Sequence, residues 1–178
     1  MDALIVVDMQ VGLLEGLPKY DLGGVVARLG AVAASVRKRG GRVVSIRHCG
    51  PSGDAFATGA PGWAFLPDLL PQPEDLVIEK RLNDAFAGTE LAPALRNIGA
   101  TRLLIGGWAT DFCVDATVRS AVSHGHAVTV VADGHTVSDR PHLEAAGVIR
   151  HHHWIWRGLI ADKPLRLESA SRLIDDGR

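Results

Sequence analysis

Short apolar runs alternate along the chain with segments in which apolar residues recur at helical spacing. The runs have the length and the Val, Ile and Leu content of strands that are buried on both faces. They lie at residues 3–7 (ALIVV), 42–47 (RVVSIR), 76–78 with the strand ending at Glu79 and Lys80, 102–105 (RLLI) and 127–131 (AVTVV). Because helices separate them, the pattern predicts a parallel sheet covered on both faces, in a three-layer α/β/α fold.

Four segments have the periodicity of helices, and cap or glycine residues mark several of their ends. Asp21 is a candidate N-cap for the first, which ends at two glycines. Thr89 is a candidate cap for the second, and Gly99 ends it. The predicted helices cover residues 21–39, 91–98, 111–124 and 141–151.

The bulk properties of the chain predict one domain over residues 1–178 and argue against several kinds of partner. A chain of 178 residues can bury its own core, and its mixed charges, with a net charge of -1, leave no basic patch for nucleic acid. Two distant cysteines, Cys49 and Cys113, fit a reducing compartment. No basic leader precedes the first apolar run, and no apolar run reaches the ~20 residues of a membrane span. We therefore expect a cytoplasmic protein that binds neither nucleic acid nor membrane.

Three reactive side chains follow three of the predicted strands. Asp8 ends the first strand, Lys80 ends the third, and Cys113 begins the helix after the fourth. Ligands of a parallel sheet gather outside the carboxyl ends of its strands. Each residue alone is weak evidence, since a lone cysteine in an α/β core is usually a small buried side chain. Their shared edge makes them candidate catalytic residues, with the irregular residues 49–73 as an active-site loop.

The chemistry of these residue types fits nucleophilic catalysis. A thiol attacks as the thiolate, and a helix N-terminus or a nearby cation lowers its pKa. Asp8 is placed to take the proton of Cys113 and to return it to a leaving amine, while Lys80 keeps Asp8 ionised. Free backbone N–H groups at Cys113 and near Ala109 are candidates for an oxyanion hole, and Gly106 and Gly107 allow the turn.

Three segments resemble those of the isochorismatase-like cysteine hydrolases. They are "IVVDMQ" with Asp8, "VIEKRLNDAFAGTEL" with Lys80 and "GWATDFCVDATVRSA" with Cys113. A fourth, "VTVVADGHTVSD", is similar to that family's fifth strand and the loop after it. The resemblance runs from residue 3 to about residue 160, and three ordered segments form a specific signal.

The resemblance implies a six-stranded parallel sheet and hydrolysis of a carbon–nitrogen bond in a small amide or ureido compound. Cys113 would form a thioester acyl-enzyme, and the amides of Ala109 and Cys113 would form the oxyanion hole. It also implies a cis peptide bond between Trp108 and Ala109, and a homo-oligomer.

The resemblance leaves other activities open. Nicotinamidases of the family bind a metal through an Asp-x-His pair, whereas here "SIRHCGPSGDAF" contains His48 and Asp54 without that spacing, so we expect no metal or other cofactor. Isochorismatases, which cleave a vinyl ether, often have glycine in place of the nucleophile, so Cys113 favours the amidohydrolases. Vinyl-ether hydrolysis, nicotinamidase activity and a catalytically silent binding protein remain the alternatives.

Several other residues are candidates with ordinary structural alternatives. Trp63, Phe86 and Trp108 are candidates for pocket walls, although aromatic side chains belong more often to a core. Cys49 and His48 are neighbours in a strand, so they point to opposite faces and are interpreted as structural. The three histidines at 151–153 point in directions about 100° apart on a helix. They are therefore interpreted as a helix end with one histidine packed inward, not as a metal site.

Overall fold

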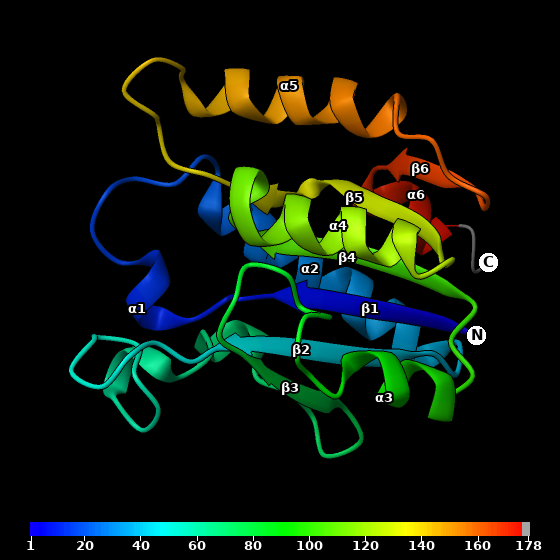
Figure 1. Ribbon diagram of the computed structural model, residues 1–178, viewed down its shortest axis with the longest axis horizontal. Coiled ribbons are helices and arrows are strands. Elements are labelled where there is room, and N and C mark those ends of the chain that lie inside the picture. Colours follow the sequence, from blue (N-terminus) through cyan, green and yellow to red (C-terminus); the bar gives the residue numbers. More distant parts are fainter. Residues whose placement is uncertain (176–178) are drawn as a thin grey trace.

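The computed structural model describes residues 1–175, and a six-stranded parallel sheet forms its centre (Figure 1). The strands lie in the order β3-β2-β1-β4-β5-β6. They are β1 (Asp2–Val7), β2 (Arg42–His48), β3 (Leu76–Lys80), β4 (Arg102–Trp108), β5 (Ala127–Thr136) and β6 (Leu165–Glu168). The predicted α/β class is therefore confirmed, as is the six-stranded sheet that the family resemblance implied.

The strand order places a reversal of direction at the middle of the sheet. The chain moves outward from β1 through β2 to β3, then returns to β4 on the other side of β1 and moves outward again to β6. Loops after β1 and β4 therefore leave the sheet on opposite sides, and a crevice forms at the carboxyl ends of these two strands. Asp8 follows β1 and Cys113 follows β4, so the topology alone brings the two residues to the same crevice.

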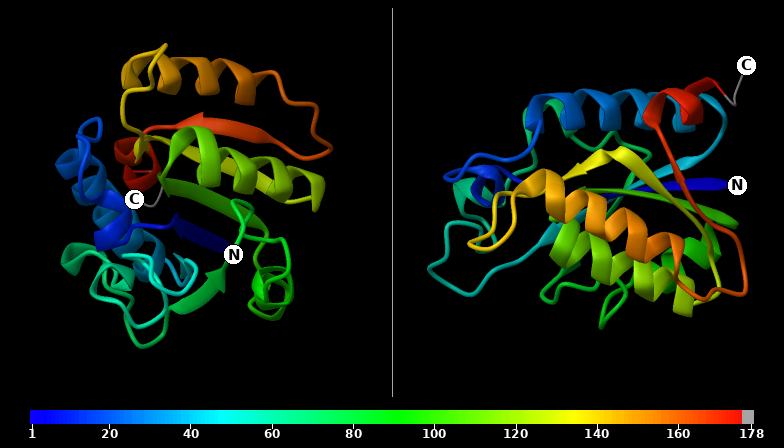
Figure 2. Two further views of the ribbon diagram at one scale, coloured as in Figure 1. Left: turned by 60° about the vertical axis from the view of Figure 1, so that its left-hand side comes forward. Right: turned by 90° about the horizontal axis from the view of Figure 1, so that it is seen from above.

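Helices cover both faces of the sheet (Figure 2). One apolar cluster packs α3 and α4, together with Trp156 of α5, against alternate strand residues such as Ile5 and Ile105. The other packs α2 and α6 against the intervening residues, among them Leu4 and Leu104. The helices are α1 (Val11–Leu14), α2 (Leu22–Lys38), α3 (Leu91–Asn97), α4 (Asp115–Ser123), α5 (Ala145–Arg157) and α6 (Ala170–Asp175).

One predicted helix has different bounds for a local physical reason, and two predicted caps lie where helices begin. The helix predicted at residues 141–151 is α5, Ala145–Arg157, because residues 140–143 form a turn and Asp139 accepts a hydrogen bond from the amide of Ala145. Asp21 is the N-cap residue of α2, as predicted, and its carbonyl accepts from the amide of Val25, while its carboxylate pairs with Arg28. Thr89 accepts a hydrogen bond from the amide of Leu91 at the start of α3, as predicted.

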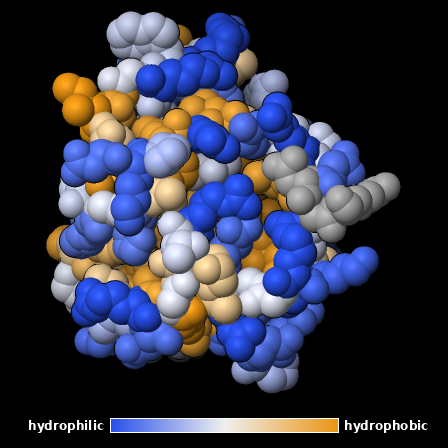
Figure 3. All heavy atoms as spheres, turned by 90° about the vertical axis from the view of Figure 1, so that its right-hand side faces the viewer, coloured by the Kyte–Doolittle hydropathy of each residue, from blue (hydrophilic) through white to orange (hydrophobic). Residues whose placement is uncertain are grey.

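Figure 3 shows the end of the molecule away from this crevice, where the strands begin. Hydrophilic and hydrophobic residues are intermixed there. Ion pairs link the strands at this end, and Arg102 at the start of β4 pairs with Asp2 of β1 at 2.6 Å. Within residues 1–175, no helix has both the length and the apolar character needed to cross a bilayer.

Candidate active site

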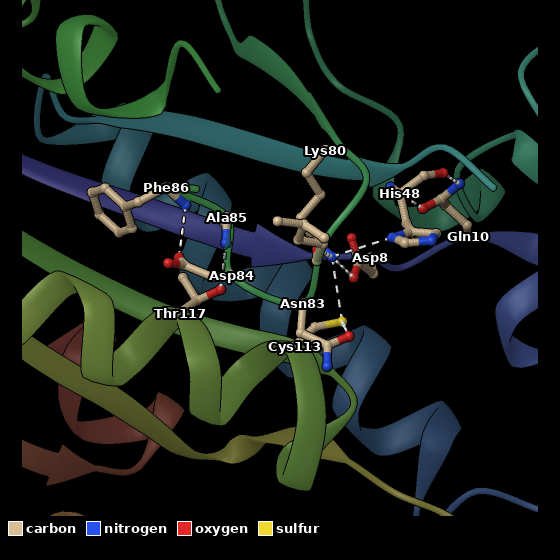
Figure 4. Close-up of polar contacts among 11 residues, drawn as sticks. Asp8, Gln10, His48, Lys80, Asn83, Asp84, Ala85, Phe86, Cys113 and Thr117 are labelled. Atoms are coloured by element: carbon tan, nitrogen blue, oxygen red, sulfur yellow. Dashed lines mark hydrogen bonds and ion pairs between the residues drawn. The ribbon is translucent and has the colours of Figure 1, made fainter. Parts of the chain in front are cut away.

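Asp8 stands where β1 stops and the chain turns away from the sheet. Its side chain is fully buried, and its backbone has a φ of 51°, a left-handed conformation that is uncommon for a residue with a Cβ. The amide of Asp8 still donates to the carbonyl of Ile46 in β2, so the residue continues the hydrogen-bonding of the strand. This geometry turns the carboxylate into the crevice at the end of the sheet (Figure 4).

Lys80 is the last residue of β3, and it lies beside His48 in the register of β2 and β3. Its side chain is almost fully buried and reaches past β2 toward β1. The ammonium Nζ lies 2.7 Å from Oδ2 of Asp8, donates to the carbonyl of Leu82 at 2.9 Å and lies 3.5 Å from Nδ1 of His48. Lys80 is thus held by groups that neutralise or accept its protons, as a buried ammonium requires.

Cys113 lies in a π-helical turn, Thr110–Val114, between β4 and α4. The Trp108–Ala109 peptide bond before this turn is cis. Gly107 has a φ of 128°, and a Cβ at this position would collide with the backbone of Val7, so only glycine lets β4 approach β1 here. The turn directs Sγ of Cys113 to within 3.3 Å of Nζ of Lys80 (Figure 4).

The structure therefore brings Asp8, Lys80 and Cys113 together around one ammonium group. Burial raises the pKa of Asp8 above its usual range, although Lys80 and the Cys113 thiol oppose this effect. Apart from these two groups, neither oxygen of Asp8 has a hydrogen-bond partner within residues 1–175. The carboxylate is therefore free to receive a proton from the thiol.

The electrostatics of Cys113 differ from the expectation of a thiol activated by a helix N-terminus. Burial, followed by the negative charge of Asp8, raises the pKa of Cys113 to about 12. The thiol is thus protonated at neutral pH in the free protein. The positive charge of Lys80 opposes this rise without reversing it, so a base near Sγ is required to take the proton during attack.

Three further polar residues lie at the site: Gln10 and Asn83, which the sequence analysis did not identify, and His48, which it interpreted as structural. His48 lies beside Lys80, and burial followed by the nearby positive charge of Lys80 lowers its pKa, so the ring is neutral at neutral pH. Gln10 joins the end of β2 to the loop at Trp63, through hydrogen bonds with the backbone of His48 and the carbonyl of Trp63. The thiol of Cys113 faces Oδ1 of Asn83 at 3.7 Å. For Gln10 and Asn83, the available signal was a polar residue two or three positions after a strand-end acid or lysine, and for His48 it was a polar residue at the end of β2.

The three aromatic candidates lie in different environments. Phe86 is buried in the core, and its ring contacts that of His124 at a centroid distance of 4.7 Å, so it points away from Cys113 (Figure 4). Trp63 donates from its indole to Sγ of Cys49. Trp108 packs against the apolar cluster on the α2 side of the sheet, the face opposite α4. The side chains of Trp63, Phe86 and Trp108 take no part in the hydrogen bonds and ion pairs described for Asp8, Lys80 and Cys113.

A cavity of about 310 Å³ opens beside Lys80, with Arg81, Leu82 and Gly88 in its walls.

Cys49 is buried and accepts the Trp63 indole hydrogen bond, in agreement with a structural role. Within the described part of the chain, no three His, Cys, Asp or Glu side chains are grouped closely enough to hold a metal ion. The expected absence of a metal stays a prediction.

Comparisons with known proteins relate this geometry to one family. Residues 2–151 match the family model described as the isochorismatase domain. A streptothricin hydrolase of Streptomyces noursei is 33% identical over 142 residues, which is 79% of this chain and 51% of the relative, so the chain spans about half the length of that protein. A ureidoacrylate amidohydrolase of Stutzerimonas stutzeri is 26% identical over 168 residues, covering 74% of this chain and 68% of the relative.

A solved structure extends the similarity to the whole fold. It is a putative hydrolase of the isochorismatase family from Chromobacterium violaceum, 27% identical, with a TM-score of 0.87 over 98% of this chain and 92% of the other. The chain belongs to the isochorismatase family.

Proposed function

We propose that the protein is a cysteine amidohydrolase that cleaves a carbon–nitrogen bond of a small amide or ureido compound through a thioester acyl-enzyme. One observation supports this function above the others: the ammonium of Lys80 lies 2.7 Å from the Asp8 carboxylate and 3.3 Å from the Cys113 thiol, inside the crevice. A nucleophile, a base and a group that orients both are the parts that nucleophilic acyl transfer requires.

The residues would act in a fixed order. Asp8 takes the proton of the Cys113 thiol as Sγ attacks the substrate carbonyl carbon, and the carbonyl π electrons move onto oxygen. The backbone N–H groups of Ala109 and Cys113 stabilise this oxyanion. When the oxyanion collapses, the carbon–nitrogen bond breaks, and Asp8 returns the proton to the leaving nitrogen. A water molecule then gives a proton to Asp8 as its oxygen attacks the thioester carbon. The carbon–sulfur bond breaks, the acid leaves, and Asp8 returns the proton to Sγ of Cys113.

The raised pKa values of Asp8 and Cys113 suit this sequence of proton transfers. A carboxylate whose pKa is raised by burial is a stronger base than an exposed aspartate, so it matches a thiol that is reluctant to ionise. The ammonium of Lys80 lies beside both groups and favours the negative charge that passes from Asp8 to sulfur.

The chemistry named for two relatives supports the same class of substrate. One is a ureidoacrylate amidohydrolase and the other a streptothricin hydrolase. Vinyl-ether hydrolysis and nicotinamidase activity remain the alternatives, and turnover of isochorismate or of nicotinamide would identify them. The homo-oligomer and the single-domain organisation also stay predictions, which light scattering of the purified chain and limited proteolysis test.

The test is ammonia release from a panel of small amides, ureides and nicotinamide, with wild type compared with Cys113→Ala. We expect turnover by the wild type and none by the variant, with the two proteins equal in circular dichroism. Denaturing mass spectrometry during turnover should show the acyl adduct on the peptide that contains Cys113 and not on the one that contains Cys49. Turnover retained by Cys113→Ala, with isochorismate or an amide as substrate, would contradict the covalent mechanism.

A further inference from the structure

Two histidines that the proposed reaction does not use connect the nucleophile turn to β5 and α5. His135, in β5, is 2% exposed. Its Nδ1 lies 2.8 Å from Oγ1 of Thr110, and its Nε2 lies 3.0 Å from Nε2 of His153 in α5. Thr110 is fully buried, belongs to the same π-helical turn as Cys113 and donates to the carbonyl of Thr136 at 3.1 Å. A continuous series of hydrogen bonds thus runs from α5 to the turn.

The hydrogen bonds join the two histidines and the threonine into one series. Oγ1 of Thr110 is shared between Nδ1 of His135 and the carbonyl of Thr136. Burial lowers the pKa of His135 to about 3, so the ring is neutral and has one N–H donor and one bare acceptor nitrogen. One proton lies between the Nε2 atoms of His135 and His153, and His153 also bonds the backbone of Ala132, so both rings have partners, as a buried polar network requires.

Helix α5 also holds the other end of the turn. Trp156 is fully buried, and its indole N–H donates to Oδ1 of Asp115 at 2.7 Å. Asp115 is the first residue of α4, directly after the π-helical turn. The Trp156 ring also packs edge-on against His135 at a centroid distance of 5.2 Å. The nucleophile turn is therefore held from one helix on both sides of Cys113.

The three consecutive histidines of the sequence have different surroundings. His153 is the one packed inward, as predicted, although the helix continues to Arg157 instead of ending there. His152 bonds the carbonyl of Val148 in its own helix, and His151 is exposed. Of these three histidines, only His153 bonds a residue of the sheet.

We propose that His135 and His153 are positioning residues for the nucleophile, which act through Thr110 to keep Sγ of Cys113 in contact with Lys80 and Asp8. The inference rests on the proposed function, in which Cys113 attacks the substrate. Neither histidine contacts the thiol, so their effect is on its placement. A displacement of about 1 Å at a reacting atom costs on the order of 100-fold in rate, so such a series has a strong effect on turnover.

The first test compares two variants of Thr110, one without the side-chain hydroxyl and one that keeps it. Thr110→Val keeps the shape of the side chain and removes both hydrogen bonds, whereas Thr110→Ser keeps the hydroxyl. We expect Thr110→Val to lower kcat by about tenfold with KM changed by less than about twofold, and Thr110→Ser to retain most of kcat. The matched control is Thr129→Val, the same change at a buried threonine that lies in β5 and outside the turn. It should leave kcat unchanged.

A second measurement does not depend on the substrate. A turn that is released moves the thiol toward water and away from Asp8, so the pKa of Cys113 falls toward that of a free cysteine. Alkylation of Cys113 by iodoacetamide at pH 8 should therefore become about tenfold faster in Thr110→Val, while turnover becomes slower. Alkylation at wild-type rate in a folded Thr110→Val protein would overturn the inference, as would equal losses of kcat in the Val and Ser variants.

The helix provides an independent pair of variants if Thr110→Val does not fold. His153→Phe removes the hydrogen bond to His135, and His153→Gln offers a side-chain amide, which can donate or accept, in its place. His151→Phe is the control on the exposed face of the same helix. We expect faster alkylation of Cys113 in His153→Phe alone, and identical rates in all three proteins would overturn the inference. If no compound in the panel is hydrolysed, the proposed function fails for those compounds, while the alkylation rates still test the positioning role.

Discussion

The two sides of the candidate active site are held together by different forces. On one side, Asp8 and Lys80 form an ion pair whose side chains are both fully buried, at 2.7 Å. On the other, the turn of Cys113 is held mainly by neutral hydrogen bonds and by the partly exposed Arg140–Asp111 pair. Loss of one member of a buried ion pair leaves an uncompensated charge, whereas each contact of the turn is small. We therefore expect the first side to control stability and rate together, and the second to control rate more than stability.

The largest effect is expected when the charge balance of the buried pair is broken. Lys80→Met removes the ammonium and leaves the Asp8 carboxylate buried without a counter-charge. The free energy of unfolding should fall by about 3–5 kcal/mol, and turnover should be lost. Urea unfolding followed by circular dichroism measures the first, and ammonia release measures the second.

The double variant Asp8→Asn/Lys80→Met is the control, because it removes both charges. It should recover most of the lost stability and none of the activity. If the double variant were as unstable as Lys80→Met, the loss would come from packing of the lysine stem or from its bond to Leu82, not from the unpaired carboxylate.

The pH dependence of the rate is expected to report on Asp8. Burial raises the pKa of Asp8, and a protonated carboxyl cannot accept the thiol proton. As the pH falls through this raised pKa, kcat/KM should fall tenfold per pH unit, with a midpoint above the ordinary value of 3.8. Because the pKa of Cys113 is about 12, ionisation of the thiol should cause no second inflection near neutral pH. A midpoint at or below 3.8 would show that the carboxyl is not perturbed, or that another group is the base.

The same division explains what the sequence predicted and what it did not. Asp8, Lys80 and Cys113 were predictable because each directly ends or follows an apolar strand, and parallel strands bring such positions to one edge. The topology brings them to one edge, and the left-handed backbone at Asp8 and the π-helical turn at Cys113 set their distances. The hydrogen-bonded series from His153 through His135 to Thr110 joins residues far apart in the chain, and its members are ordinary polar residues in their own segments. No local pattern distinguishes them from solvated side chains.

The errors in the fold follow a related rule. β6 (Leu165–Glu168) was not predicted because four residues at a sheet edge, only partly buried, give neither a long apolar run nor a clear periodicity. β5 continues to Thr136, beyond the apolar run, because its pairing with β4 resumes after an irregularity between Ile105 and Gly107. That polar extension contains His135. The positions with the weakest sequence signal are therefore those that support the nucleophile turn.

A smaller loss of stability is expected on the side of the turn. Arg140 makes two hydrogen bonds of 2.7 Å to the carboxylate of Asp111, and its guanidinium lies over the ring of Phe112. Arg140→Gln should lower the free energy of unfolding by about 1–2 kcal/mol, since the pair is partly exposed. It should nevertheless lower kcat by about tenfold, because Asp111 and Phe112 immediately precede Cys113. Urea unfolding and steady-state kinetics measure both, and a loss of stability with unchanged kcat would contradict a role of this pair in placing the turn.

The smallest effect is expected for the Arg119–Asp115 ion pair, because both residues belong to α4, the helix that follows the turn of Cys113. Arg119 pairs with Asp115 at 2.9 Å across one turn of α4, and its side chain is 45% exposed. Asp115 keeps its hydrogen bond from Trp156 when Arg119 is replaced, so the anchorage to α5 remains. Arg119→Gln should therefore cost about 0.3–0.5 kcal/mol in urea unfolding and leave kcat within twofold of wild type. A loss of kcat as large as that of Arg140→Gln would mean that pairs within α4 hold the turn. It would contradict the idea that the bond from Trp156 of α5 is enough to hold Asp115 in place.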